Sequence, residues 1–166
     1  GWKIVKKNQP THCSIAIEWY NQKFNSVLSE INDHFNKFRI SDALMAVYKL
    51  IWDDFCSVFL EIVKPNYGEH IDSKTFEQIV SIFEKNLIII HPFMPFISEE
   101  IWHLIEKRSK ENAIIIAEWP SSTNSNDNDL IQDFESLLKV ISGIRNFRKK
   151  HHVSFKDSLE LSIVNN

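Results

Sequence analysis

The sequence predicts an all-α fold, a bundle of about five helices, and three observations lead to that prediction. The 166 residues include only 3 Gly and 5 Pro, too few turn formers for a fold built from many short strands. Apolar residues recur at steps of three and four in five separate stretches, which is the spacing of one helix face. A hydrophobic content of 43% suits a globular protein with a real core.

The first helix is predicted over residues 14–35. Its apolar positions are three or four residues apart through about six turns, and polar residues occupy most of the other positions. The apolar positions are Ile17, Tyr20, Phe24, Val27, Leu28, Ile31 and Phe35. This face is expected to turn toward the core.

The second helix is expected to follow Ser41, a residue type that caps helix N-termini, with Asp42 in its first turn. Pro65 is expected to bound it. Its predicted apolar face consists of Leu44, Val47, Ile51, Phe55, Val58 and Ile62. Trp52 in this helix, like Trp102 and Trp119 further on, is expected in the core.

Two prolines separate the third and fourth helices. The third helix is predicted to be capped by Asp72 or Ser73 and to be ended by Pro92, which biases His91 away from the helical region. Pro95 suits the first turn of the fourth helix, which runs to about residue 107, and Glu99 and Glu100 fall near its N-terminus. The stretch at residues 91–102 is therefore expected to form a buried corner. The side chains expected to pack there are Phe93, Met94, Phe96 and Trp102.

The last part of the chain is predicted to contain two short extended segments and the fifth helix. The extended segments lie near residues 114–116 and 159–163, where they could pair with each other, and the helix spans residues 130–150. Residues 121–129 have the composition of a low-complexity linker. The predicted domains are a helical bundle over residues 1–150, with this linker inside it, and a C-terminal extension that starts at residues 151–166.

Composition and charge limit the classes of partner. The net charge of −3 gives no global positive field, so a nucleic-acid partner would have to bind local clusters. No apolar run is long enough to cross a bilayer, and a membrane partner is not expected. Cys13 and Cys56 cannot form a disulfide framework, which is consistent with a reducing compartment. The expectation is a cytoplasmic monomer.

Catalytic and metal-binding patterns are weak in this sequence. There is no glycine-rich phosphate loop and no nucleophile elbow. The adjacent Asp53 and Asp54 point in different directions on a helix and make a poor acid–base pair. Metal binding has two candidate pairs, His12 with Cys13 and His151 with His152, but neighbouring residues seldom supply two ligands to one ion. No catalytic residue, no metal site and no cofactor are therefore predicted within this chain.

Two small clusters of cations are the candidate binding residues. Arg145, Arg148 and Lys149 fall on one broad face near the end of the last helix, where RNA phosphates could be held. The second cluster lies between the first two helices and contains Lys37, Phe38 and Arg39, which combine cations with an aromatic ring suited to unstacked RNA bases. The alternative interpretation is a pair of solvated helix ends whose cations complement the helix dipoles.

Four stretches resemble one family in order and spacing. They are HPFMPFISEEIW at residues 91–102, IWDDFC at residues 51–56, AEWP at residues 117–120 and ISGIRNFR at residues 141–148. As a set they resemble the helical anticodon-binding domain of class I aminoacyl-tRNA synthetases for valine, isoleucine and leucine. The WDDFC stretch is similar to the valine type more than to the isoleucine type.

This resemblance implies a bundle that binds the anticodon arm of valine tRNA. Aminoacylation would take place in a separate catalytic domain of the same full-length chain, with ATP and magnesium, and this part alone would be non-catalytic. The corner at residues 91–102 would then be architecture that sets a helix–helix angle. Two alternatives stay open: a purely structural or protein-interaction helical bundle, and the same domain of an isoleucine–tRNA ligase.

Overall fold

The computed structural model describes residues 2–122, 128–154 and 156–162. The chain divides into two compact units, residues 1–127 and residues 128–166. The division falls within the predicted linker at residues 121–129, of which residues 123–127 lie outside the described part, and it differs from the predicted domain boundary at residue 150. That residues 151–166 begin a C-terminal extension stays a prediction.

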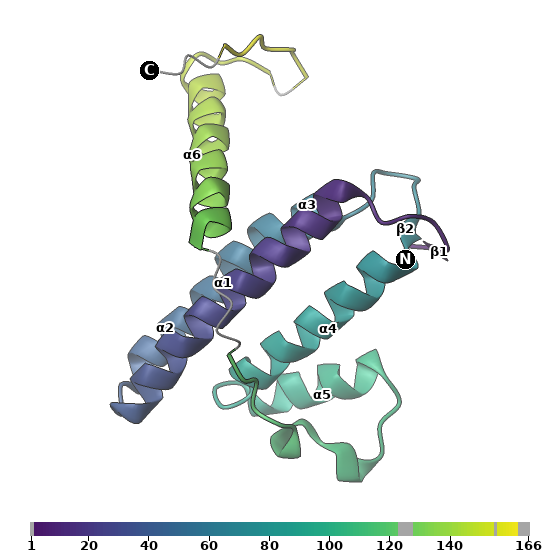
Figure 1. Ribbon diagram of the computed structural model, residues 1–166, viewed down its shortest axis with the longest axis vertical. Helices are drawn as coiled ribbons and strands as arrows, with labels where there is room; N and C mark the ends of the chain where they lie inside the picture. Colours follow the sequence, from purple (N-terminus) through teal and green to yellow (C-terminus); the bar gives the residue numbers. More distant parts are fainter. Residues whose placement is uncertain (1, 123–127, 155, 163–166) are drawn as a thin grey trace. The chain divides into compact units, whose positions relative to one another are not determined.

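The fold is all-α, as predicted, and Figure 1 shows the elements in order. Five long helical segments are described, because α2, η1 and α3 form one continuous helix. The elements are α1 (Thr11–Asn36), α2 (Ile40–Lys49), the π-helical η1 (Leu50–Phe59), α3 (Leu60–Val63), α4 (Ser73–Ile90), α5 (Pro95–Ile105), the 3-10 turns η2 (Lys110–Asn112) and η3 (Ile114–Ile116), and α6 (Asn128–Lys150).

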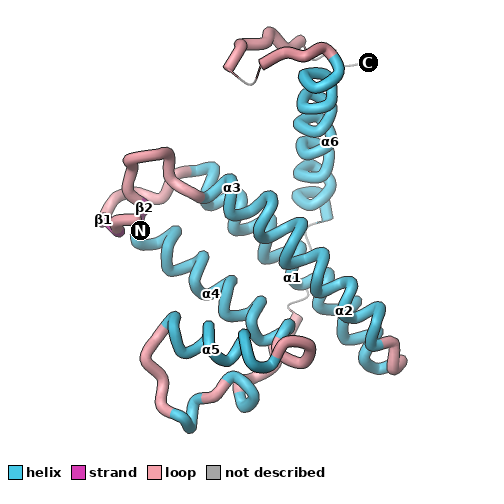
Figure 2. The backbone as a smooth tube through the Cα atoms, turned by 180° about the vertical axis from the view of Figure 1, so that it is seen from behind, coloured by secondary structure: helices cyan, strands magenta, loops and turns pink. Residues whose placement is uncertain are grey.

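The core of the first unit lies between α1, the continuous α2–η1–α3 helix and α4. Figure 2 shows α1 alongside the second helix, with α4 and α5 next to each other. Tyr20 is central to this core: its ring lies 5.4 Å from that of Phe55 and 5.0 Å from that of Phe59. Its hydroxyl donates to Asn86 Oδ1 at 2.9 Å. Of the predicted face of the first helix, the buried residues are Ile17, Tyr20, Phe24, Leu28 and Ile31, and the half-buried ones are Val27 and Phe35.

The second helix contains a π-helical segment, which changes the residues that face the core. Up to its first residue, the buried positions Ala43, Val47 and Leu50 follow α-helical spacing. The next buried position is Phe55, five residues on, which is the repeat of a π-helix. In an uninterrupted α-helix Asp54 would lie close to that place. The π-helix therefore puts an aromatic ring where an α-helix would put a carboxylate.

The predicted face of the second helix is partly wrong. Val47 and Phe55 are buried, as predicted, but Leu44 is 41% exposed. The half-buried members of that face are Ile51, Val58 and Ile62. Trp52, expected in the core, is 58% exposed, while Trp102 and Trp119 are half-buried. The spacing of the apolar residues does not reveal the π-helical segment, because apolar residues continue at steps of three and four through it.

The helix ends agree with the sequence at some positions only. Asp72 caps α4, since its Oδ1 accepts a hydrogen bond from the backbone N–H of Thr75 at 2.8 Å. Lys64 before Pro65 is extended, with ψ 137°, and the helix ends at Val63. The predicted cap at Ser41 is wrong, because α2 begins one residue earlier, at Ile40. 

The small sheet lies elsewhere than predicted. β1 (Ile4–Val5) pairs in parallel with β2 (Ile71–Asp72), Ile4 opposite Ile71 and Val5 opposite Asp72. The predicted extended segment at residues 114–116 is a 3-10 turn, and the described residues 159–162 form no strand, while residue 163 lies outside the described part. The backbone N–H of Ile114 is bound by the carboxylate of Glu99, so this donor needs no strand partner.

Candidate nucleic-acid interface

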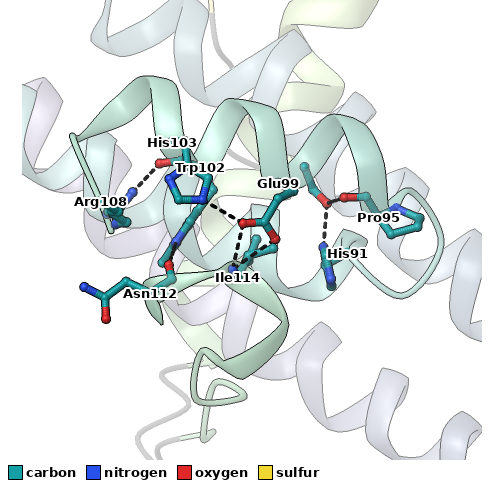
Figure 3. A network of polar contacts seen from close by, with 9 residues as sticks. His91, Pro95, Glu99, Trp102, His103, Arg108, Asn112 and Ile114 are labelled. Atoms are coloured by element: carbon teal, nitrogen blue, oxygen red, sulfur yellow. Dashed lines mark hydrogen bonds and ion pairs between the residues drawn. The ribbon is translucent and has the colours of Figure 1, made fainter. Parts of the chain in front are cut away.

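The α4–α5 corner, residues 91–94, is held by polar contacts. Ser98 is 1% exposed; its hydroxyl donates to the carbonyl of Met94 at 2.7 Å and lies 2.8 Å from His91 Nδ1. Figure 3 shows His91 pointing at α5 across this contact. Pro95 occupies the first turn of α5, as predicted.

Two expectations for this corner are wrong. His91 keeps a helical conformation, with φ −53° and ψ −40°, because its ring contact with Ser98 and its backbone bond to Leu87 outweigh the bias from Pro92. The buried apolar junction is not formed as expected: Phe96 is 91% exposed and Met94 is 48% exposed. Phe96 is the second residue of α5 and lies outside the contact that Ser98 makes, so it adds little to the core.

The loop after α5 is fastened by side chains of that helix. Both carboxylate oxygens of Glu99 lie near the backbone N–H of Ile114, at 3.3 and 3.2 Å, and Glu99 Oε1 lies 2.9 Å from His103 Nε2 (Figure 3). The first turn of α5 contains no acidic residue, so the expected role of Glu99 and Glu100 at the helix N-terminus is wrong. Glu99 instead attaches a loop to the helix.

Trp102 makes the second attachment of this loop. Its indole N–H donates to the carbonyl of Asn112 at 3.0 Å, and the Arg108 guanidinium lies 3.9 Å from the centre of its ring. Arg108 also donates to the carbonyl of Trp102 and pairs with Glu84 of α4. These contacts hold α5 and its loop against α4, whereas Met94 and Phe96 of the same stretch are exposed.

The α1–α2 turn, defined by Lys37, Phe38 and Arg39, is built differently. The N–H of Phe38 donates to the carbonyl of Phe35 at 3.0 Å, and the N–H of Arg39 donates to that of His34 at 2.8 Å. This pair of bonds is the Schellman motif that closes many helices, and its left-handed position is usually glycine. Phe38 occupies that position here, with φ 57°, and its side chain is 88% exposed.

The charges of the α1–α2 turn are only partly neutralised. Lys37 Nζ lies 2.7 Å from Asp33 Oδ2, and this hydrogen bond lowers the pKa of Asp33. Arg39 is exposed. The structure therefore brings all three predicted residues of this cluster to one exposed turn, with an aromatic ring between two cations.

The end of α6 closes with the same main-chain motif in the second unit. His152 has φ 53°, and the N–H of Val153 donates to the carbonyl of Arg148 at 2.9 Å. The Arg148 guanidinium donates to the carbonyls of Ser154 and Asp157, the latter at 2.8 Å. The α6 cluster, defined by Arg145, Arg148 and Lys149, thus contains two exposed cations and one half-buried cation that is bound to the backbone.

Two ring pairs were not predicted as site features. The rings of Phe147 and His151 lie 4.4 Å apart beside the α6 cluster, and those of Tyr48 and Trp52 lie 6.2 Å apart at an interplanar angle of 11°. Both pairs have i, i+4 spacing, which is the signal that could have found them. His151 thus contacts a ring, while of the other proposed metal pair His12 is exposed and Cys13 is buried.

The described residues also bear on metal binding, nucleophilic chemistry and membrane crossing. They contain no group of three or more His, Cys, Asp or Glu side chains placed to hold a metal ion. Burial raises the pKa of the Cys13 and Cys56 thiols, which opposes the thiolate form that nucleophilic chemistry needs. Among the helices of the described ranges, none has the length and apolarity that a membrane crossing requires.

Comparison with known proteins agrees with the all-α fold. Residues 18–163 match the profile of a family described as the anticodon-binding domain of tRNA ligase. The chain is 50% identical over 167 residues to the valine–tRNA ligase of Christiangramia forsetii, 39% over 164 residues to that of Phocaeicola vulgatus and 39% over 166 residues to that of Porphyromonas gingivalis. These alignments cover 100%, 99% and 99% of this chain but only 19% of each relative. The chain, which spans about a fifth of the length of these relatives, belongs to the family of anticodon-binding domains of tRNA ligases.

Proposed function

We propose that this chain binds the anticodon arm of valine tRNA as part of a valine–tRNA ligase. The family supports tRNA as the partner, and the names of the relatives support valine. The observation that carries the proposal is Phe38, an exposed ring held in a left-handed conformation between two cations.

Phe38 is an unfavourable residue for folding alone. A left-handed conformation costs a residue with a side chain about 1–2 kcal/mol, and glycine would close the same helix without that cost. The exposed ring gains little from burial in return. A strained residue whose side chain the fold does not use is a candidate for function. A flat ring beside cations suits an unstacked RNA base, which stacks on aromatic faces while its phosphates meet Lys37 and Arg39.

The α6 cluster is proposed to contact phosphates of the anticodon stem. Arg145 and Lys149 are exposed and carry the positive charge that phosphate contact requires. Arg148 is also proposed to contact phosphate. It would do so with the guanidinium N–H groups that do not donate to the carbonyls of Ser154 and Asp157. Phosphate contacts would position the tRNA without selecting its sequence.

The proposal for the parent protein follows from the same reasoning. A separate catalytic domain of the full-length chain would join valine to the tRNA, with ATP and magnesium, in the cytoplasm and as a monomer. The 166-residue chain by itself should give no valine-dependent pyrophosphate exchange. Exchange that persists after traces of full-length ligase are removed would contradict this division of roles.

The test is a titration of the chain with two transcripts, valine tRNA and the same tRNA with an altered anticodon, at several salt concentrations. Phe38→Leu keeps an apolar side chain at the strained position but removes the ring face. It should reduce the preference for the valine anticodon by about 5- to 140-fold, corresponding to the roughly 1–3 kcal/mol of one stacked base. Phe38→Tyr should keep the preference.

A second variant separates base contact from phosphate contact. Arg145→Gln should weaken binding of both transcripts equally and reduce the slope of affinity against salt by about one unit. Arg145 is a cleaner probe than Arg148, because replacing Arg148 also removes its bonds to residues 154 and 157. If Phe38→Leu leaves the preference unchanged and Arg145→Gln leaves both affinities unchanged, both clusters are solvated helix ends.

A protein-interaction role is the second candidate, and one feature favours it. The second helix exposes an apolar stripe at steps of four residues, with exposures of 41–58%. Its members are Ile40, Leu44, Tyr48 and Trp52. If the domain were only a protein-binding bundle, the unaltered chain would bind neither transcript.

An isoleucine tRNA transcript added to the titration tests the other alternative, since a preference for it would assign the domain to an isoleucine–tRNA ligase.

A further inference from the structure

Phe35, three residues before Phe38, is contacted by rings from two distant segments. The ring of Phe93, in the α4–α5 corner, stacks on it with centroids 6.0 Å apart and an interplanar angle of 16°. The ring of Trp119 meets it edge-on, with centroids 5.9 Å apart and an angle of 67°. We call Phe35, Phe93 and Trp119 the Phe35 cluster.

Trp119 is also hydrogen-bonded to α1. Its indole N–H donates to Asn32 Oδ1 at 3.1 Å, one turn before Phe35. The ring contact with Phe35 and the hydrogen bond to Asn32 lie on the same face of α1, and together they fix the position and the rotation of its last turn. A ring contact alone would let the indole slide along the helix. Trp119 is half-buried, so this bond is partly shielded from water.

The last turn of α1 is joined directly to the exposed ring of Phe38. The carbonyl that accepts the N–H of Phe38 belongs to Phe35, the residue that the two distant rings contact. A shift of Phe35 therefore shifts the acceptor of the bond that defines the left-handed turn. Within the described part of the chain, the side-chain contact that the α1–α2 turn makes is the exposed Lys37–Asp33 pair.

The distant rings are themselves held by the contacts shown in Figure 3. Phe93 lies in the corner that Ser98 and His91 fasten, and Trp119 follows the loop that Glu99 attaches at Ile114. This gives a continuous series of contacts from α5, through its corner and loop, to the end of α1.

We infer that Phe93 and Trp119 are positioning residues for anticodon recognition: through Phe35 they hold the α1–α2 turn in the orientation in which Phe38 meets a base. The inference rests on the proposed function of that turn. It assigns a role in recognition to one residue each of the HPFMPF and AEWP stretches, Phe93 and Trp119, which act through Phe35. Stacking itself tolerates any base, so Phe38 contributes to selectivity only by holding a base where neighbouring groups meet its edge, and that requires a ring whose plane is fixed.

The experiment is a double-mutant cycle on the complete 166-residue chain, with the two transcripts described above. Trp119→Ala should lower the preference for the valine anticodon by about three- to tenfold, at the lower end of the couplings found between contacting residues. In the Phe38→Leu background the same change should lower it by less than about twofold, because the ring that Trp119 positions is already absent. Trp119→Phe, which keeps a ring but loses the bond to Asn32, should give an intermediate loss and serves if Trp119→Ala fails to fold.

Phe59→Leu is the control for general loss of stability, because Phe59 is fully buried in the core and contacts Tyr20 and Phe55 instead of the Phe35 cluster. It should reduce stability without changing the preference between transcripts. The inference is overturned if Trp119 variants change the preference no more than Phe59→Leu does, or by equal factors in both Phe38 backgrounds. If Phe38→Leu itself has no effect on the preference, the proposed function of the turn fails, and the inference fails with it.

Discussion

The two helix-to-helix corners of the first unit use their side chains in opposite ways. In the α4–α5 corner, His91 and Ser98 bind each other and the backbone, and Phe93 stacks on α1. In the α1–α2 turn, the main chain alone closes the helix, and Phe38 and Arg39 extend into solvent. The corner that is prominent in the sequence is thus used by the fold. The inconspicuous turn carries side chains that the fold leaves available, which is what a binding site requires.

The largest expected effect is on stability, at Phe93 in the α4–α5 corner. Phe93→Ala should lower the free energy of unfolding by about 2–3 kcal/mol, below the 3–5 kcal/mol of a fully buried Phe because Phe93 is half-buried. Chemical denaturation monitored by circular dichroism measures this change. A loss below about 1 kcal/mol would mean that the stack on Phe35 does not fix the corner.

The polar contact in the same corner should have a smaller effect. Ser98→Ala removes the hydroxyl that donates to Met94 and contacts His91 Nδ1, and it should cost about 1–2 kcal/mol of unfolding free energy. Ser98→Thr, which keeps the hydroxyl, is the matched variant in the same denaturation experiment. Equal stabilities for the alanine variant and the unaltered chain would show that the corner is held by apolar contacts after all.

A substitution in the α1–α2 turn should change stability in the opposite direction. Phe38→Gly should raise the free energy of unfolding by about 0.5–1 kcal/mol, because glycine adopts the left-handed conformation without strain and the exposed ring contributes little to packing. The same variant should lose preference for the valine anticodon, so stability and recognition would change in opposite directions. Destabilisation by Phe38→Gly would indicate that the ring has a structural role.

The ion pair of this turn should affect binding weakly. Asp33→Asn removes the partner of Lys37 and should strengthen binding of both transcripts by about twofold, with a steeper salt dependence, because an exposed pair contributes little and a freed lysine can meet a phosphate. The bond to Lys37 lowers the pKa of Asp33, so the carboxylate stays charged down to a pH below its ordinary pKa. Affinity for either transcript should therefore show no step from Asp33 between neutral and mildly acidic pH.

The smallest effect is expected at Phe96, the exposed aromatic beside the structural corner. Phe96→Ala should change the free energy of unfolding by less than about 0.5 kcal/mol, since 91% of this residue is exposed. It is the control for Phe93→Ala, with the same change of side chain three positions away. A loss of several kcal/mol would restore the apolar junction that the sequence suggests.

The sequence by itself determined the class of fold and most of its helices. Steps of three and four place the first helix and its core residues from Ile17 to Ile31, because helical periodicity is a local property of the chain. The ends at Pro65 and Asp72 were equally readable, since proline geometry and side-chain capping act within a few residues. The clustering of Lys37, Phe38 and Arg39 at one exposed turn also followed from their being neighbours between two helices.

Only the tertiary structure decided which of several similar residues the fold uses. Phe93 and Phe96 belong to one motif, yet one stacks on α1 and the other is exposed, because the direction of each side chain depends on a partner far away in the sequence. The π-helical turn puts Phe55 in the core beside the ring of Tyr20, and local periodicity does not encode that packing. Arg148 looked like Arg145 in the sequence, and only the returning chain at Ser154 and Asp157 distinguishes them. The spacing of apolar residues specifies which side chains share a helix face. The side chains that pack against that face come from distant parts of the chain, and the spacing does not specify them.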